Sequence, residues 1–513
     1  MTTAPAKGSG ADDESARLEG LGYTSEFKRE MSLSANFALG FTYLSPVVAT
    51  YTLFALALAT GGPPMIWWLV IVGVGQFLVA LVFGEVVSQF PVAGGVYPWA
   101  RRLWGRRWAW MTGWVYMIAL LVTIASVVYG AGPYLALLLE FTPGTGSTVT
   151  CALIMLAVAL GLNMLGTKIL ALAATIGFVA ELVGALIVGG WLLITERHHN
   201  LSALFDTEGV TGTSGGYLSA FLAAAIIGVY QYYGFEACGD VAEEVPDPTR
   251  VIPRAMRMTI YIGGAASILV CLSLLLAVPD FSAVISGEDT DPVINVLNSA
   301  FGVTGTKFVL LVVMISFLSC TLSLMAAASR LMYSYARDDM IFASHLFRHF
   351  DQKRHVPPYS MIVAATVPGL IVLGSMISTK ALTSIVSFAI LGIYLGFQMV
   401  VLAALRARLK GWVPSGSFTL GRWGMPVTIA ALTYGVLTMI NIAWPRTPDA
   451  AWYDNYLVAL SAVVGVGIGA VYLAVAKPYL RSEARHGDAV PTDSGSTDPG
   501  STDSVSAGNE PGQ

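Results

Sequence analysis

Charged residues make up only 12% of the 513-residue sequence, whereas 55% of the residues are hydrophobic. So little charge cannot cover the surfaces of soluble domains of this total size. No polar region between the two ends of the chain is long enough to fold by itself. The scarcity of charge therefore excludes a soluble multidomain protein and predicts an all-α polytopic membrane protein embedded in a lipid bilayer.

Cysteine is also scarce, and the four cysteines lie within apolar runs without metal-ligand spacing: Cys151, Cys238, Cys271 and Cys320. We therefore expect reduced, buried thiols and no disulfide framework. The sequence likewise shows no cluster of metal ligands and no paired nucleophile and base. We accordingly expect no metal or other cofactor and no nucleic-acid partner, and we expect that the protein is not an enzyme.

Long apolar runs are what the chain has in abundance. A membrane-spanning helix needs roughly 20 apolar residues, and twelve runs meet this requirement. We expect transmembrane helices near 36–60, 65–90, 107–139, 148–166, 168–195, 217–245, 254–279, 304–336, 359–378, 381–405, 424–444 and 454–477. The polar segments 1–35 and 478–513 are expected to be disordered tails, and the first is too long and acidic for a signal peptide.

The basic residues predict the orientation of these helices. If the amino terminus lies inside the cell, 24 of the 28 Lys and Arg residues fall on cytoplasmic segments. Those left outside are Arg197, Lys307, Lys380 and Arg446. This excess on one side follows the positive-inside rule. We therefore expect a multi-pass plasma-membrane protein with both termini in the cytoplasm.

The sixth apolar run is interrupted by Tyr232, Tyr233, Gly234, Phe235 and Glu236. Glycine lets the backbone bend there, and tyrosines offer hydroxyls and ring faces to a small molecule. A helix is then expected to resume with Glu236, Asp240 and Glu243 on one face, which must look at water, protein or a cation. Two interpretations stay open: a glycine kink whose acids neighbouring helices hold, or a helix broken to build a substrate site.

The first apolar run contains its own interruption, formed by Ser45, Pro46, Val47, Val48 and Ala49. Proline removes a backbone donor and disturbs the carbonyls one turn earlier, so backbone groups there need other partners. The two interruptions lie five spans apart. An incidental kink explains either one alone but explains the pair poorly, because paired breaks are typical of inverted-repeat transporters.

Two further polar features lie inside apolar runs. Glu181 has apolar neighbours for two turns on either side. It is either a proton carrier or a protonated glutamate that is hydrogen-bonded in the core. The hydroxyls of Ser319, Thr321 and Ser323 offer a cation site, but hydroxyls in membrane helices more often bond their own backbone, and we favour that interpretation.

Four stretches occur in a shared order along the chain: FPVAGGVYPWAR, YYGFEACGDVAEEVPDPTRVIPRA, SRLMYSYARDDM and SFTLGRWGMP. Together they resemble the amino acid-polyamine-organocation superfamily of secondary transporters. The last stretch and SPVVATYTLF are closest to its amino acid/choline transporter subgroup. The resemblance covers about residues 30–480.

The resemblance implies a LeuT-like fold. Residues 36–195 and 217–405 would form two inverted five-helix repeats, with two peripheral helices in 424–477. Substrate would lie between the broken helices 1 and 6, lined by helices 3, 8 and 10. Ser45–Ala49 and Tyr232–Glu236 would then contact it. Glu236 falls where some members carry a glutamate implicated in proton-linked gating, and Glu181 falls near where others carry a lysine in place of sodium.

The chain departs from the family pattern in two places. The first break is Ser45-Pro46-Val47-Val48 rather than a glycine-rich stretch whose free amides bind a carboxylate. This weakens the case for an ordinary α-amino acid and leaves room for γ-aminobutyrate, polyamines, choline or ethanolamine. Position 181 carries an acid rather than a lysine, so the charge balance of the transport cycle must differ.

The sequence thus predicts a permease that imports a small amino acid or amine, such as γ-aminobutyrate, by proton symport with alternating access. Polyamine, choline or ethanolamine transport, sodium coupling and exchange stay open as alternatives, and the sequence does not indicate an oligomeric state. A channel is disfavoured because no repeated polar or charged ring occurs. A nutrient sensor with a transporter fold is the alternative outside transport.

Overall fold

The computed structural model describes residues 18–23, 26–212, 216–377, 381–446, 451–481 and 488–489. Within these ranges the chain forms helices and no β-strand, which confirms the all-α prediction. Much of the two tails that we expected to be disordered, namely 1–17, 24–25, 482–487 and 490–513, lies outside the described residues.

The helices of the first half are α2 (Leu33–Leu44), α3 (Pro46–Gly61), η1 (Pro63–Ile66), α4 (Trp67–Gln89), α5 (Val96–Trp104), α6 (Arg106–Leu138), α7 (Thr145–Asn163), α8 (Thr167–Thr195), η2 (Leu201–Phe205), α9 (Tyr217–Ala224), α10 (Ile226–Gln231), α11 (Ala237–Asp240) and η3 (Ala242–Glu244). Those of the second half are α12 (Pro248–Met258), η4 (Thr259–Gly263), α13 (Gly264–Ala277), α14 (Phe281–Ser286), α15 (Pro292–Arg337), α16 (Ser344–Phe347), α17 (Pro358–Gly374), η5 (Ser375–Ile377), α18 (Ala381–Leu409), η6 (Gly421–Trp423), α19 (Gly424–Ala443), α20 (Trp452–Asn455), α21 (Leu457–Ala476) and η7 (Pro478–Leu480).

Among the described residues, 11 helical segments are long and apolar enough to cross a membrane. They are Leu33–Gly61, Pro63–Gln89, Arg106–Leu138, Thr145–Asn163, Thr167–Thr195, Pro248–Ala277, Pro292–Arg337, Pro358–Ile377, Ile385–Leu409, Gly421–Ala443 and Leu457–Ala476. Each corresponds to one of the twelve expected spans. The remaining expected span, 217–245, contains the shorter apolar helix Tyr217–Gln231 and then breaks, as its sequence predicts.

The second part of that span differs from the expectation of one resumed helix. After the break, α11 lasts only four residues, and Glu243 and Glu244 lie on the separate 3-10 turn η3. The next long helix begins early, at Pro248 in place of residue 254. Proline at the first helical position explains this start, because its missing N–H is not needed there.

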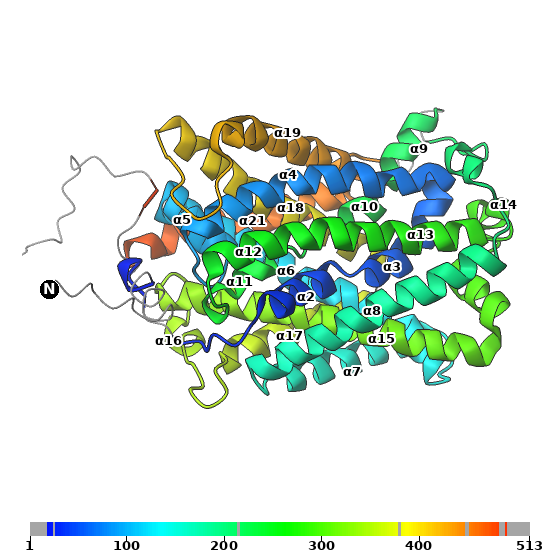
Figure 1. Cartoon of the computed structure of the whole chain (residues 1–513), viewed down its shortest axis with the longest axis horizontal. Coiled ribbons are helices and arrows are strands. Elements are labelled where there is room, and N and C mark those ends of the chain that lie inside the picture. The colour runs from blue at the N-terminus through cyan, green and yellow to red at the C-terminus, as the bar shows by residue number, and fades with distance from the viewer. Residues whose placement is uncertain are drawn as a thin grey trace, which may run out of the picture.

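The spans run side by side along the long axis of the molecule (Figure 1). The first described residues, 18–23, lie at the same end as α5 and α16, whereas α9 and α14 lie at the opposite end. We call these the basic end and the outer end of the bundle. The basic end takes its name from the arginines of α5 and from those at the end of α15.

Burial separates central helices from peripheral ones. In the most apolar stretches of Leu33–Gly61 and Arg106–Leu138, 83% of the residues are buried, against 17% for Gly421–Ala443 and 6% for Leu457–Ala476. The broken first span and α6 are therefore central, while α19 and α21 are peripheral. This is the position that the resemblance implies for the last two helices.

One buried ion pair fastens peripheral α19 to the bundle. Arg408 of α18 pairs with Glu85 of α4, and the two side chains are 8% and 1% exposed. Arg408 also donates to the Thr428 hydroxyl on α19 at 3.2 Å, and Glu85 accepts from the Leu420 N–H at 2.8 Å. Three helices and the connector before α19 thus share one set of polar contacts.

We predict that Arg408→Met lowers the free energy of unfolding by about 3–5 kcal/mol, because it leaves Glu85 buried without its cation. Thermal unfolding of the purified protein measures this change. Adding Glu85→Gln to Arg408→Met should recover part of the loss, since the uncompensated charge is then gone. Arg406→Met is the control, because Arg406 lies on the same helix with its guanidinium over the Trp104 ring. If Arg408→Met loses no more unfolding free energy than Arg406→Met, the prediction is contradicted.

Candidate functional site

The first helix break is centred on Ser45, whose backbone has φ +40°. Ser45 is the N-cap of α3, and its hydroxyl accepts from the Val48 N–H at 3.2 Å. Pro46 follows at the first helical position, where the missing N–H costs nothing. A Ser-Pro pair therefore ends α2 and starts α3, which confirms the predicted interruption.

The carbonyls released by this break are bonded by a side chain of the other broken span. The Gln231 amide donates to the Leu44 carbonyl at 3.0 Å and to the Ser45 carbonyl at 3.2 Å. Gln231 is the last residue of α10, directly before the second break. The second broken span therefore supplies hydrogen-bond partners to the backbone of the first break, as a membrane interior requires.

Gly234 brings the two breaks into direct contact. Its φ of +109° is a conformation that favours glycine. A Cβ atom at this position would lie 2.6 Å from the Leu44 nitrogen, so only a residue without a side chain fits there. Beside it, the rings of Tyr43 and Tyr233 pack edge to face with centroids 5.8 Å apart.

Glu236 lies at the centre of this contact and is fully buried. One carboxylate oxygen accepts from the Gly234 N–H at 2.8 Å, and the other accepts from the Tyr116 hydroxyl of α6 at 2.9 Å. Among the described residues no ion pair neutralises it at a distance of 4.0 Å or less. A buried carboxylate held by neutral donors alone is a group ready to take a proton or a cationic ligand.

Glu181 contacts the first break from α8. It is buried on α8, and one of its oxygens accepts a hydrogen bond from the Ser45 hydroxyl. Its other oxygen has no hydrogen-bond partner among the described residues. Ser45 thus lies between the two backbone segments and Glu181, so a change in the protonation of Glu181 acts directly on the break.

The remaining residues of the predicted site have different surroundings. Tyr232 points away from the first break, because Cβ atoms on Gly73 of α4 and Gly264 of α13 would lie within 3.0 Å of its hydroxyl. Phe235 packs against Phe83 and Phe397 instead. On the first break, Pro46, Val47, Val48 and Ala49 are all buried. Substrate contact at these residues stays a prediction.

The hydroxyls proposed for a cation site mostly bond their own helix. Ser319 donates to the Ile315 carbonyl at 2.9 Å, and Thr321 donates to the Phe317 carbonyl at 2.7 Å. Ser323 instead lies 3.0 Å from the Thr42 hydroxyl of α2. These contacts match the structural interpretation that we favoured, and a cation site there stays an untested prediction.

The acids that follow the second break face protein. Glu244 pairs with Arg330 at 2.9 Å with both side chains fully buried, and Glu243 pairs with Arg337 at 3.0 Å. Asp240 is fully buried too, but neither of its carboxylate oxygens has a hydrogen-bond partner among the described residues. It lies against Gly95, where a Cβ would come within 2.2 Å of one of these oxygens.

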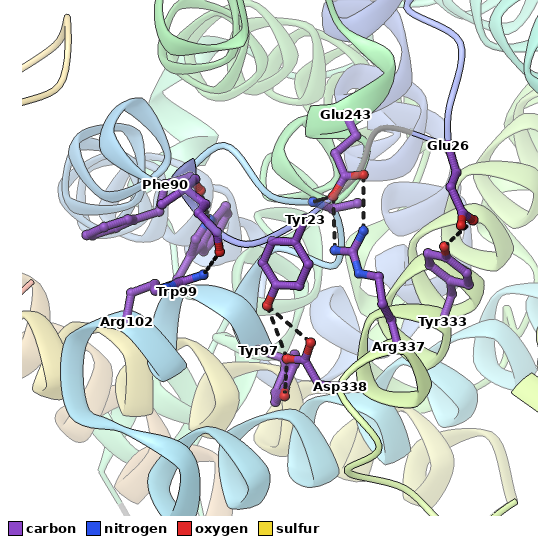
Figure 2. Close-up of polar contacts among 12 residues, drawn as sticks. Tyr23, Glu26, Phe90, Tyr97, Trp99, Arg102, Glu243, Tyr333, Arg337 and Asp338 are labelled. Atoms are coloured by element: carbon purple, nitrogen blue, oxygen red, sulfur yellow. Dashed lines mark hydrogen bonds and ion pairs between the residues drawn. The ribbon is translucent and has the colours of Figure 1, made fainter. Parts of the chain in front are cut away.

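Polar contacts close the basic end beneath these acids (Figure 2). Arg337 holds Glu243 while its guanidinium stacks 4.1 Å from the centroid of the Tyr23 ring. The Tyr23 hydroxyl donates to Asp338, which also accepts from Tyr97 of α5 at 2.7 Å. Burial raises the pKa of Asp338, against the opposing effects of Arg337 and the two tyrosine hydroxyls.

The described part of the amino-terminal segment takes part in this closure, which differs from the disorder that we expected for 1–35. Tyr23, Phe27 and Met31 are at most 7% exposed. Glu26 accepts from the Tyr333 hydroxyl at 2.6 Å. A few aromatic and apolar residues within a polar segment thus anchor it to the bundle, a signal that the overall composition conceals.

Sequence reasoning missed two residues of the site. Gln231 is a lone amide at the end of an apolar helix, directly before the break, and its position was a usable signal. Tyr116 had no local signal, because its hydroxyl reaches Glu236 only through the packing of α6. The resemblance implied the helix but not the residue.

Residues 32–468 match the amino acid permease family. The chain belongs to that family. This permease is 27% identical over 527 aligned residues to the amino-acid permease BAT1 homolog of Oryza sativa subsp. japonica. The alignment covers 93% of this chain and 95% of the relative.

Two other similar proteins carry informative names. Amino-acid permease BAT1 of Arabidopsis thaliana is 26% identical, over 87% of this chain and 92% of its own length. The choline transporter of Saccharomyces cerevisiae is 24% identical, over 82% of this chain and 76% of its own length. The chain is therefore a membrane transporter of the amino acid-polyamine-organocation superfamily and not an enzyme, as the sequence predicted.

We predict that Gly234→Ala destabilises this permease and abolishes uptake. The strained φ alone costs about 1–3 kcal/mol, and the added methyl group forces the two breaks apart. Thermal unfolding and uptake into proteoliposomes measure the two effects. Gly161→Ala on α7, where a Cβ meets nothing within 4 Å, is the matched control and should behave like wild type. Wild-type uptake by Gly234→Ala would show that the contact between the breaks is dispensable.

Proposed function

We propose that this permease imports a small amino acid or amine, such as γ-aminobutyrate, across the plasma membrane by proton symport with alternating access. The observation that carries the proposal is the meeting of two helix breaks between two buried glutamates, Glu181 and Glu236. Each glutamate bonds one of the breaks directly. A change of charge on either glutamate is therefore coupled to the segments that must move.

The polar groups at the breaks favour the amine end of a substrate. Pro46 has no N–H, and the Val48 N–H is already bonded to Ser45. Few backbone donors are therefore left for a carboxylate at the first break. Glu236, by contrast, supplies a negative charge beside the aromatic rings of Tyr43 and Tyr233, and such a combination attracts an ammonium group.

Proton coupling follows from the cost of a buried charge. An ionised carboxylate in an apolar interior is expensive unless a cation or several donors hold it. Glu236 has two neutral donors, and Glu181 has one. Protonation from outside lowers the free energy of a closed state like the present one, and release of the proton inside restores the charge. Each state therefore binds the proton differently, which drives a population shift.

The direction of transport rests on the orientation of the bundle. The basic end carries the arginines of α5, α15 and α18 and is assigned to the cytoplasm by the positive-inside rule. Both termini then lie in the cytoplasm. The network of Glu243, Arg337, Tyr23 and Asp338 closes that side, so the described conformation is closed toward the cytoplasm.

A cationic amine is the second candidate substrate. The relative from Saccharomyces cerevisiae is named a choline transporter, and Glu236 beside tyrosine rings suits choline, ethanolamine or a polyamine equally. Sodium coupling and substrate exchange are alternatives to proton symport, and a sensor that keeps the transporter fold is the alternative outside transport. All of these give different results in one uptake experiment.

The test is uptake into proteoliposomes of γ-aminobutyrate, neutral and basic α-amino acids, putrescine, choline and ethanolamine, with and without an inward proton gradient. One pH unit corresponds to about 1.4 kcal/mol, so symport of one proton should accumulate the substrate about tenfold. We expect Glu236→Gln or Glu181→Gln to abolish the dependence on the gradient, because glutamine carries no exchangeable charge. Uptake by wild type should rise as the outside pH falls.

Glu288→Gln is the matched control, because Glu288 is exposed on the loop after α14 and should leave uptake unchanged. Accumulation driven by sodium or by counter-substrate alone would overturn proton symport. If folded wild-type protein takes up none of these compounds, transport of this substrate class is overturned.

A further inference from the structure

The outer end of the bundle contains a cavity of about 500 Å³ that the proposed transport site does not use. It lies between α3, α6, the start of α7 and the residues that lead into α15. Its volume is within the range of cavities that hold small molecules. We asked which chemistry its lining would recognise.

Four aromatic side chains line this outer cavity: Tyr51, Tyr129, Tyr134 and Phe141. Tyr51 and Tyr134 pack edge to face with their ring centroids 5.8 Å apart, and the Tyr134 hydroxyl donates to the Tyr51 carbonyl at 2.7 Å. This bond fixes the Tyr134 ring in place, and the Tyr51 ring packs against it. The faces of such rings attract cations, and rings around a cavity are how proteins recognise organic ammonium groups.

One acidic side chain, Asp291, also lines the cavity. Among the described residues no hydrogen bond or ion pair is formed by the Asp291 carboxylate. The neighbouring Asp289 behaves differently, because its carboxylate accepts from the Asp291 N–H at 3.1 Å and from the Asn295 amide at 2.8 Å. The loop thus fixes Asp291 while leaving its charge available.

An ion pair lies beside the cavity. Glu140 precedes Phe141 in the chain and pairs with Lys307. Asp291 therefore supplies a negative charge to the lining, together with aromatic walls and the hydroxyl-bearing residues Ser147 and Thr148. This combination selects a small organic cation and repels an anion.

The position of the cavity connects it with the first helix break. Tyr51 lies on α3 six residues beyond Ser45, which is about 9 Å along the helix. The Tyr51–Tyr134 pair therefore stands between the cavity and the breaks. A ligand in the cavity would lie on the outer side of the permease, next to a helix that must move for transport.

We propose that the outer cavity is a second binding site, which captures the ammonium group of an amine through Asp291 and the surrounding aromatic rings. This proposal rests on the proposed function only in that the captured amine is then the compound transported. Binding itself requires no transport, so the two proposals can fail separately.

The test measures binding of choline by titration calorimetry with the purified full-length protein at low ionic strength. The neutral analogue 3,3-dimethyl-1-butanol, which has the same shape without the charge, is the matched probe. We expect Asp291→Asn to weaken choline binding at least tenfold and to leave binding of the neutral analogue unchanged. Asparagine is also a good N-cap residue, so α15 should still begin correctly, and thermal unfolding checks this.

Two further variants define the result. Glu288→Gln removes an exposed charge that does not line the cavity and should bind choline like wild type. Glu236→Gln should keep the Asp291-dependent binding, because Glu236 belongs to the central site. Equal choline affinity in Asp291→Asn and wild type would overturn the outer site, as would an equal loss of choline and of its neutral analogue.

The same samples separate this proposal from the transport proposal. Asp291-dependent choline binding without uptake of any amine supports the outer site and overturns the proposed import. If the protein takes up an amine but Asp291→Asn does not change its choline binding, import is supported and the outer site is overturned.

Discussion

The constraint on which this structure depends is that backbone polar groups inside a membrane must find partners within the protein. At the break around Ser45, the Gln231 amide from the second broken span bonds the carbonyls of Leu44 and Ser45, and the Ser45 carbonyl also accepts from the Ala49 N–H at 3.5 Å. Gly234 lets the two segments touch. The two breaks are therefore held against each other at the centre of the bundle.

Two glutamates convert this structural unit into one that responds to charge. Glu181 bonds Ser45 from α8, and Glu236 bonds the Gly234 N–H within the second break. At the basic end, Arg330 and Arg337 neutralise Glu244 and Glu243. Glu243 and Glu244 are thus paired with arginines where the bundle is closed, whereas Glu181 and Glu236 have only neutral partners where the breaks meet. This division assigns closure to the paired acids and response to the unpaired ones.

The sequence predicted the parts of the fold that have local causes. A Ser-Pro pair and a glycine within apolar runs marked both breaks, and run length marked the spans. It did not predict what packing decides: that Tyr116 reaches Glu236, that Tyr232 points away toward Gly73, or that α11 lasts only four residues. The anchoring of the amino-terminal segment was missed for a related reason. A few aromatic residues in a polar segment reveal an anchor only when the residues that they pack against are known.

The most direct test of the central claim is an electron cryomicroscopy structure in lipid nanodiscs with the transported compound bound. The account predicts ligand density that touches both breaks, Ser45–Ala49 and Tyr232–Glu236, with the amine within hydrogen-bond distance of the Glu236 carboxylate. Ligand density that contacts neither break would contradict the account. A ligand-bound state in which Gln231 and Gly234 no longer hold the two breaks together while transport continues would also contradict it.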